Sequence, residues 1–184
     1  MRRTDSHPGQ SAFTLIELLI VVTIMGVMIA ALTVGIRGYL QRSDDAHRKT
    51  DIKKIARALE EYYNDHNGYP ASLAVNGISP TCGTNTILRQ YLPDVPCDPT
   101  GGSARPYLYL PEGSHYLGTF GSEQVYRGYR LLTALTFKSD PQLREVGCDV
   151  TTGCGGIPAV SGFPNLDKNA YNFGVAANAQ VKSP

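Results

Sequence analysis

Residues 13–36 read FTLIELLIVVTIMGVMIAALTVGI, an apolar run whose only charged residue is Glu17. As an α-helix this run would be about 36 Å long at ~1.5 Å per residue, enough to cross a bilayer core of roughly 30 Å. A carboxylate at the centre of a membrane costs about 2.5–3.5 kcal/mol on insertion scales. Because a simple anchor would be more stable without this acid, we expect Glu17 to have a partner in an apolar environment.

A short polar leader, residues 1–12 (MRRTDSHPGQSA), precedes the apolar run. A secretory signal has an apolar region of about 7–15 residues followed by a small-residue cleavage site. Here the apolar run is longer, and the small residues Ser11 and Ala12 come before it. Cleavage after Ala12 would keep the helix and free an α-amine on Phe13. Since Phe13 and Glu17 lie on one side of a helix, this amine can neutralise Glu17 in the same chain or in a neighbouring chain.

The basic leader followed by AFTLIE at residues 12–17 resembles the class III signal of type IV pilins and type II secretion pseudopilins. The resemblance implies that a prepilin peptidase cuts between Ala12 and Phe13 and methylates the new amine. It also implies that Glu17 docks the subunit into a filament of identical or related subunits, at an inner-membrane assembly platform. Ala12 stands where the family usually has glycine, so we expect slower cleavage, and Val34 stands where many members have proline.

The helix is predicted to continue beyond the membrane to about Asn67. Six apolar residues recur at helical spacing and form one stripe: Ile52, Ile55, Ala56, Leu59, Tyr62 and Tyr63. Asn67, Gly68 and Pro70 form a stop signal. The segment DIKKIARALEEYYNDHNGYP also resembles the segment after the anchor in G-type pseudopilins. We therefore expect a leader at 1–12, a transmembrane and filament-core helix at 13–36, an amphipathic helix at 37–67 and a globular head at 68–184.

The head is predicted to contain a small antiparallel sheet, which makes the chain α+β with a long N-terminal helix. Strands are expected at 107–110, 115–120, 125–137 and 171–176, with a turn at 111–114 and a short helix at 86–91. Tyr107 and Tyr109 alternate with leucines, which suits a sheet with one face on the long helix and the other in water. The tyrosines have two interpretations. We favour packing within the sheet, with their hydroxyls in water, over a role in a subunit interface.

All four cysteines follow the membrane segment, where an even number favours disulfides in an oxidising compartment. Three pairings are possible. We favour Cys82 with Cys97 and Cys148 with Cys154, because each pair closes a short, turn-rich loop. Free buried thiols are the alternative. A zinc site is disfavoured because the sequence has no C-x-x-C and no histidine near a cysteine.

The sequence gives no sign of catalysis, of a cofactor or of a nucleic-acid partner. A formal charge of +1 indicates neither a basic nucleic-acid surface nor an acidic tail. Phosphate-binding, nucleophile-elbow, zinc-protease and dinucleotide motifs are missing from the sequence. Asp140, Asp149 and Asp167 lie in a region where some G-type pseudopilins bind calcium, but without calcium-loop spacing, so no metal is predicted.

We therefore expect a structural subunit of a type IV pilus or pseudopilus, not an enzyme. The alternative is a membrane-anchored extracellular binding module or enzyme that does not polymerise, with Glu17 snorkelling to the membrane surface.

Topology is the point on which the sequence signals conflict. Basic residues at 37–54 outnumber Arg2 and Arg3, which by the positive-inside rule would place the head in the cytoplasm. Long domains translocate largely regardless of charge, and the cysteines favour an oxidising exterior. We expect a single pass through the inner membrane with the head outside, followed by incorporation into an extracellular pilus or a periplasmic pseudopilus.

Overall fold

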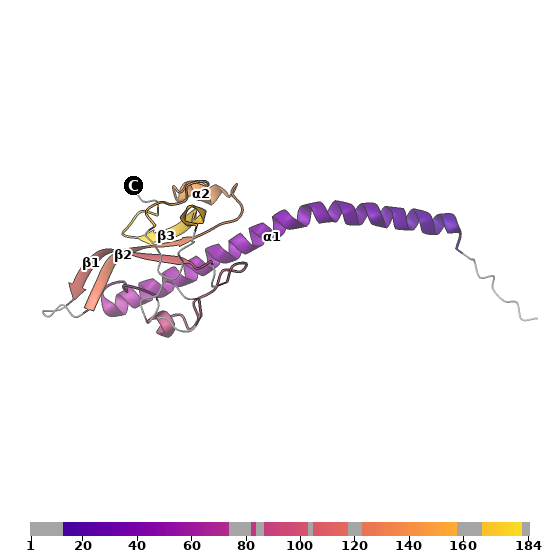
Figure 1. The fold of residues 1–184 in the computed structure, drawn as a ribbon. Helices are drawn as coiled ribbons and strands as arrows, with labels where there is room; N and C mark the ends of the chain where they lie inside the picture. Colours follow the sequence, from indigo (N-terminus) through magenta and orange to yellow (C-terminus); the bar gives the residue numbers. More distant parts are fainter. Residues whose placement is uncertain are drawn as a thin grey trace, which may run out of the picture. The chain divides into compact units, whose positions relative to one another are not determined.

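The structure, a computed structural model, describes residues 13–73, 82–83, 87–102, 105–117, 123–157 and 167–181. Two compact units divide the chain, Met1–Leu40 and Gln41–Pro184. The 52-residue helix α1, Leu15–His66, begins in the first unit and ends in the second (Figure 1). The long helix and its end point are as predicted from the sequence.

The end of α1 follows from two residues that leave the helical path. Asn67 has a left-handed φ of 54°, and its N–H donates to the Tyr63 carbonyl at 2.8 Å, as in an αL cap. At Gly68 a β-carbon would lie 2.5 Å from the Val125 side chain, so only glycine permits this approach. Tyr69 then exchanges backbone hydrogen bonds with Tyr126, which ties the helix end to the sheet.

Within the described residues, the sheet has three antiparallel strands in the order β1-β2-β3, and together with α1 it confirms the α+β class. The strands are β1 at Leu108–Leu117, β2 at Glu123–Thr133 and β3 at Phe173–Ala177. A 3-10 turn, η1 at Ile87–Gln90, takes the place of the expected short helix. The apolar stripe of α1 packs on one face of the sheet, in a buried cluster that includes Ile52, Ile55, Leu59, Tyr107, Tyr129 and Leu131.

The turn predicted at 111–114 is wrong, because β1 is one continuous strand through those residues. Pro111 pairs with Tyr129 in an edge strand, where a missing N–H costs no ladder bond. Gly113 has a φ of 68°, yet Glu112 still pairs with Gly128 and the register continues beyond it. Of the expected strand at 115–120, residues 118–120 lie outside the described residues, and β2 ends at Thr133 rather than at residue 137.

The prediction of a water-exposed sheet face is also wrong for the centre of the sheet. Leu108 and Leu132 are buried with Cys148, Cys154 and Tyr171 in a second cluster, so both faces are covered there. The tyrosine hydroxyls are not solvated either. Tyr107 donates to the Asp51 carboxylate at 3.0 Å, and Tyr109 donates to the Pro70 carbonyl at 2.7 Å.

Both disulfides join cysteines that are near each other in sequence. Cys82 is bonded to Cys97, and Cys148 is bonded to Cys154. This is the local pairing that the sequence favoured. The second disulfide belongs to the cluster that covers Leu108 and Leu132, so this small loop contributes to the apolar core of the head.

A buried arginine joins α1 to two loops of the head. The side chain of Arg48 has no exposed surface, and its Nε donates to Asp98 at 2.7 Å. Its Nη1 donates to Asp45 at 2.6 Å and to Thr136, and its Nη2 donates to Asp98 and Thr100. Each of the five guanidinium donors therefore has an acceptor, and a fully satisfied network is the condition under which burying an ion pair is tolerable.

The carboxylate of Asp98 makes the stability of the head dependent on acid. Burial by itself raises its pKa, but hydrogen bonds from Arg48, Gly101 and Thr100 outweigh burial and lower the pKa from 3.8 to about 2. A lowered pKa stabilises the folded state fully above the unfolded-state value and loses that effect as the pH falls through the folded value. We therefore expect the thermal midpoint of the full chain in detergent to fall between about pH 4 and pH 2. Asp98→Asn should be less stable at neutral pH and should flatten this acid limb. An unchanged limb in the variant would contradict the assignment.

Candidate assembly site

The apolar part of α1 begins with a reciprocal cap that neutralises none of the charge of Glu17 but gives its Oε2 two hydrogen-bond donors. The Glu17 Oε2 accepts from the Thr14 backbone N–H at 2.9 Å and from the Thr14 hydroxyl at 2.8 Å. In return, the Glu17 N–H donates to the Thr14 hydroxyl oxygen at 3.3 Å. This is a capping box, in which an N-cap threonine and the glutamate three residues later satisfy each other's backbone donors.

The cap gives Glu17 a partner that the sequence analysis did not identify. The sequence predicts a cation as the partner of Glu17, whereas the structure supplies a hydroxyl and a backbone N–H at a helix N-terminus. The positive end of the helix dipole also favours a carboxylate there. The signal was visible in the sequence, since Thr14-x-x-Glu17 before an apolar run is the sequence signature of a capping box.

Of the two residues at the expected cleavage point, the structure describes one. Phe13 lies before the first residue of α1 and is 80% exposed, while Ala12 lies outside the described residues. Cleavage between them and methylation of Phe13 remain predictions. Phe13 lies four residues before Glu17, and the predicted pairing of the Phe13 amine with the Glu17 carboxylate depends on this spacing.

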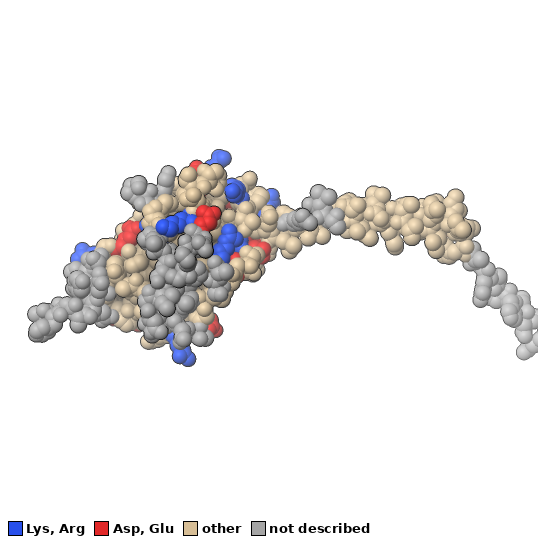
Figure 2. Space-filling view, in the orientation of Figure 1, with Lys and Arg blue, Asp and Glu red and all other residues tan. Residues whose placement is uncertain are grey.

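The helix that follows the cap is apolar on every side. Leu15–Leu32 is long and apolar enough to cross a membrane, and all of its large apolar side chains are exposed. Figure 2 shows no charged residue on the described part of this segment in that view, whereas charged residues gather on the head. A helix that is apolar all round needs lipid or other apolar helices around it, so the segment is a membrane anchor or a helix–helix contact surface.

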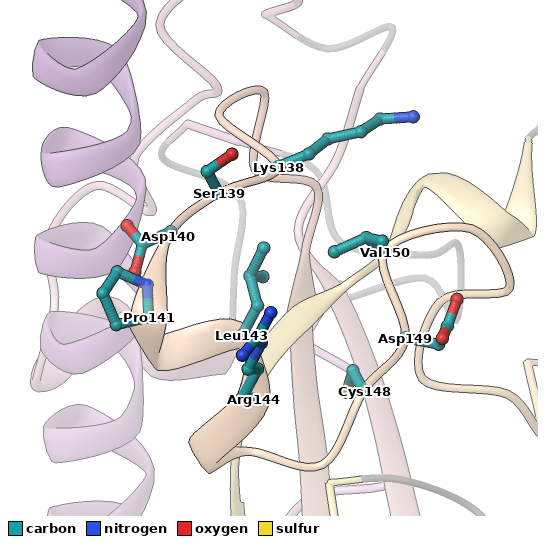
Figure 3. A pocket seen from close by; sticks show the side chains of 9 residues that line it. All are labelled: Lys138, Ser139, Asp140, Pro141, Leu143, Arg144, Cys148, Asp149 and Val150. Atoms are coloured by element: carbon teal, nitrogen blue, oxygen red, sulfur yellow. The ribbon is translucent and has the colours of Figure 1, made fainter.

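The head also contains a hollow of about 580 Å³ beside the second disulfide (Figure 3). Its walls come from the segment after β2, which includes α2 at Pro141–Glu145. The lining residues are Lys138, Ser139, Asp140, Pro141, Leu143, Arg144, Cys148, Asp149 and Val150. In Figure 3 the side chains of Asp140 and Asp149 lie on different sides of the hollow, so they do not converge on one point.

The three aspartates considered for calcium act as local caps and turns. Asp140 caps α2 by accepting from the Gln142 N–H at 3.0 Å, and it also pairs with Lys49. Asp149 accepts from the Thr151 N–H at 2.7 Å. Asp167 accepts from the Asn169 N–H at 3.1 Å, at the start of η2, Lys168–Ala170. Within the described ranges, no group of three or more His, Cys, Asp or Glu residues is placed to hold a metal ion.

Known proteins resemble the chain both at its start and over much of its length. A family model described as "Prokaryotic N-terminal methylation motif" matches residues 7–33. The type II secretion system core protein G of Pseudomonas aeruginosa is 34% identical over 126 residues, which cover 62% of this chain and 87% of that protein. Core protein G of Escherichia coli (strain K12) is 29% identical over 121 residues, 62% of this chain and 79% of that protein.

A pilus protein is also similar, over a shorter part. The type IV major pilin protein PilA of Myxococcus xanthus is 30% identical over 83 residues, which cover 45% of this chain and 38% of that protein. No solved structure matches the chain significantly.

Proposed function

The chain belongs to the family of type IV pilins and type II secretion pseudopilins, and we propose that within this family it is a subunit of a secretion pseudopilus. A structural subunit role follows from membership of the family. The choice of a pseudopilus is supported by the extent of the similarity. Core protein G of P. aeruginosa is matched over 87% of its length, whereas the major pilin of M. xanthus is matched over 38%.

The observation that carries this function is the apolar helix with its capped start. Leu15–Leu32 exposes all its apolar side chains, and related subunits polymerise. Transfer of such a helix from lipid to a bundle of like helices exchanges one apolar environment for another, so apolar burial alone gives little driving force. A polar contact must therefore fix the axial position of each subunit in the filament. Glu17 is the one acid in this segment.

We propose the following sequence of events for the chain. A prepilin peptidase removes residues 1–12 and methylates the amine of Phe13, and the assembly platform in the inner membrane receives the subunit with its head outside. Glu17 then leaves its cap on Thr14 and pairs with the Phe13 amine of a neighbouring subunit. The geometry that supports the exchange is the exposure of the capping box, since both of its residues are exposed.

Processing can be tested by mass spectrometry of the N-terminal peptide from filaments and from membranes. We expect a peptide that starts at Phe13 and carries one methyl group on its amine. In cells without the peptidase, the peptide should start upstream of residue 12. An intact leader in filaments, or an unmethylated start at another residue, would contradict the proposed processing.

Deletion of this chain from the cell distinguishes a pseudopilus from a pilus. If the chain is a pseudopilin, its loss should stop export of folded proteins to the medium and leave surface pili intact. The opposite pattern would assign it to a pilus.

A further inference from the structure

The hollow beside the second disulfide carries two cations without an ionic partner among the described residues. Lys138 and Arg144 line the hollow, and both are exposed. Neither side chain forms an ion pair or a hydrogen bond with any residue that the structure describes. Glu145 follows Arg144 on α2 but does not line the hollow. The hollow therefore offers uncompensated positive charge to a ligand.

The two carboxylates in the walls of the hollow are already engaged. Asp140 pairs with Lys49 of α1 and caps α2. Asp149 accepts from the N–H groups of Thr151 and Thr152 at 2.7 and 3.1 Å. A metal ion would have to displace these contacts, whereas an anion would leave them in place. The charge pattern thus favours an anionic ligand over a metal ion.

The hollow is also joined to the part of α1 that follows the membrane-crossing stretch. The Arg42 guanidinium lies 4.5 Å from the centre of the Phe137 ring, and Phe137 directly precedes Lys138. Arg42 is ten residues after Leu32, the last residue of that stretch. Because α1 is continuous between them, the two are about 15 Å apart along the helix. This limit depends on the chain alone and holds for any orientation of the head.

We propose that the hollow binds the headgroup of an anionic phospholipid from the membrane that holds the helix. Arginine binds phosphate oxygens through a planar fork of donors, and lysine binds them as a point charge. The volume of about 580 Å³ falls within the range of small-molecule sites, about 300–1,000 Å³. Lys138 and Arg144 lie on different sides of the hollow in Figure 3. A phosphate linked to glycerol therefore fits the two cations better than a phosphate ion does.

This site would act on the chain while its helix is still in the membrane. Each basic side chain at an anionic membrane surface strengthens binding about fivefold. The headgroup would hold the head at the membrane surface, and extraction of the subunit would break the contact. The inference requires the helix to be in a membrane, and it does not depend on which filament the chain enters.

Lipid binding by the full chain in neutral detergent micelles tests the site. Native mass spectrometry measures the binding of phosphatidylglycerol and phosphatidylcholine, two lipids that differ in headgroup charge. We expect the wild type to bind phosphatidylglycerol about 30-fold more tightly, since two cations contribute. Lys138→Gln/Arg144→Gln should remove this preference and leave phosphatidylcholine binding unchanged. The conservative variant Lys138→Arg/Arg144→Lys should retain the preference, because it keeps both charges.

Three controls separate the hollow from net charge and from folding. Arg57→Gln/Arg127→Gln removes two exposed cations on α1 and β2, and this variant should bind phosphatidylglycerol as the wild type does. Thermal midpoints of all variants in detergent should be equal, because Lys138 and Arg144 are exposed. Raised salt should weaken phosphatidylglycerol binding by the wild type, because exposed charges are screened.

Three results would overturn the inference. The first is equal affinity of the wild type for the two lipids. The second is a loss of phosphatidylglycerol binding in Lys138→Gln/Arg144→Gln no larger than in the control variant. The third is displacement of the lipid by an equal concentration of inorganic phosphate or of a tetraglutamate peptide, which would assign the hollow to a free anion or to an acidic protein segment. None of these results bears on the proposed function, whose test is the processed N-terminus in filaments.

Discussion

Replacing Glu17 by glutamine is expected to reduce filament assembly about 100-fold or more while the start of α1 stays helical. Glutamine at this position can still accept from Thr14, because capping boxes use either glutamate or glutamine. Only the charge is lost, so the amine of the neighbouring Phe13 would be left unpaired in an apolar bundle. Removing one member of a buried ion pair costs about 3–5 kcal/mol, and each 1.4 kcal/mol is about tenfold in an equilibrium.

The measurement is the ratio of sheared filament to total protein, by immunoblot of cells that carry the assembly machinery. Thr14→Ala is the matched control, since it removes the cap hydroxyl and keeps the charge. Loss of an N-cap costs about 1 kcal/mol, so this variant should retain assembly within about tenfold of the wild type.

Two results would overturn the role of Glu17. Normal filaments from Glu17→Gln would show that the carboxylate is not needed for docking. A Thr14→Ala defect as severe as that of Glu17→Gln would show that the cap, rather than the charge, is the requirement. Helicity of both full chains in detergent, measured by circular dichroism, must match the wild type for either comparison.

Replacing Arg48 by methionine is expected to destabilise the head by about 3–5 kcal/mol. Methionine fills much of the same space but leaves the carboxylates of Asp45 and Asp98 buried without their cation. Asp45 also accepts from the Thr136 and Phe137 N–H groups at 2.9 and 2.7 Å. Loss of the arginine therefore disturbs both loops that rest on the helix.

Chemical denaturation of the full chain in detergent measures this effect through the near-ultraviolet signal of the buried tyrosines. Arg48→Lys should recover little, since an ammonium group cannot reproduce five donors in a planar fork. The surface control Lys53→Ala should change the free energy of unfolding by less than about 0.5 kcal/mol.

A third variant tests whether the penalty is electrostatic. Adding Asp45→Asn and Asp98→Asn to Arg48→Met removes the charges of this buried network, so part of the lost stability should return. If Arg48→Met unfolds within about 1 kcal/mol of the wild type, the network contributes too little to hold the loops.

Features encoded by local or periodic patterns could be predicted from the sequence. The long helix and its end were predicted from the apolar run, the amphipathic stripe and the stop signal at Asn67. Each of these signals depends on neighbours within one or two turns. The short spacings between the cysteines predicted the disulfide pairing that the structure shows. Glu17 marks the proposed assembly site, although its cap on Thr14 was not predicted.

Features that depend on distant segments could not be predicted in this way. Pro111 and Gly113 have the composition of a turn, and they remain in a strand only because β1 lies at the edge of the sheet. Alternation predicts that Leu108 lies on a water-exposed face of the sheet, yet the loop of Cys148 covers it. Strand order and loop placement are set by the packing of the whole head, which alternation within one strand does not report.

The sequence by itself determined the long helix, its apolar start and the single acid within it. Hydrophobic periodicity and charge are properties of adjacent residues, so these features needed no fold to be recognised. Only the tertiary structure shows that Arg48 is buried. In the sequence, Arg48 resembles any surface charge on an amphipathic helix. Asp98 lies fifty positions away from it, and a buried arginine is stable only where folding brings all its acceptors together.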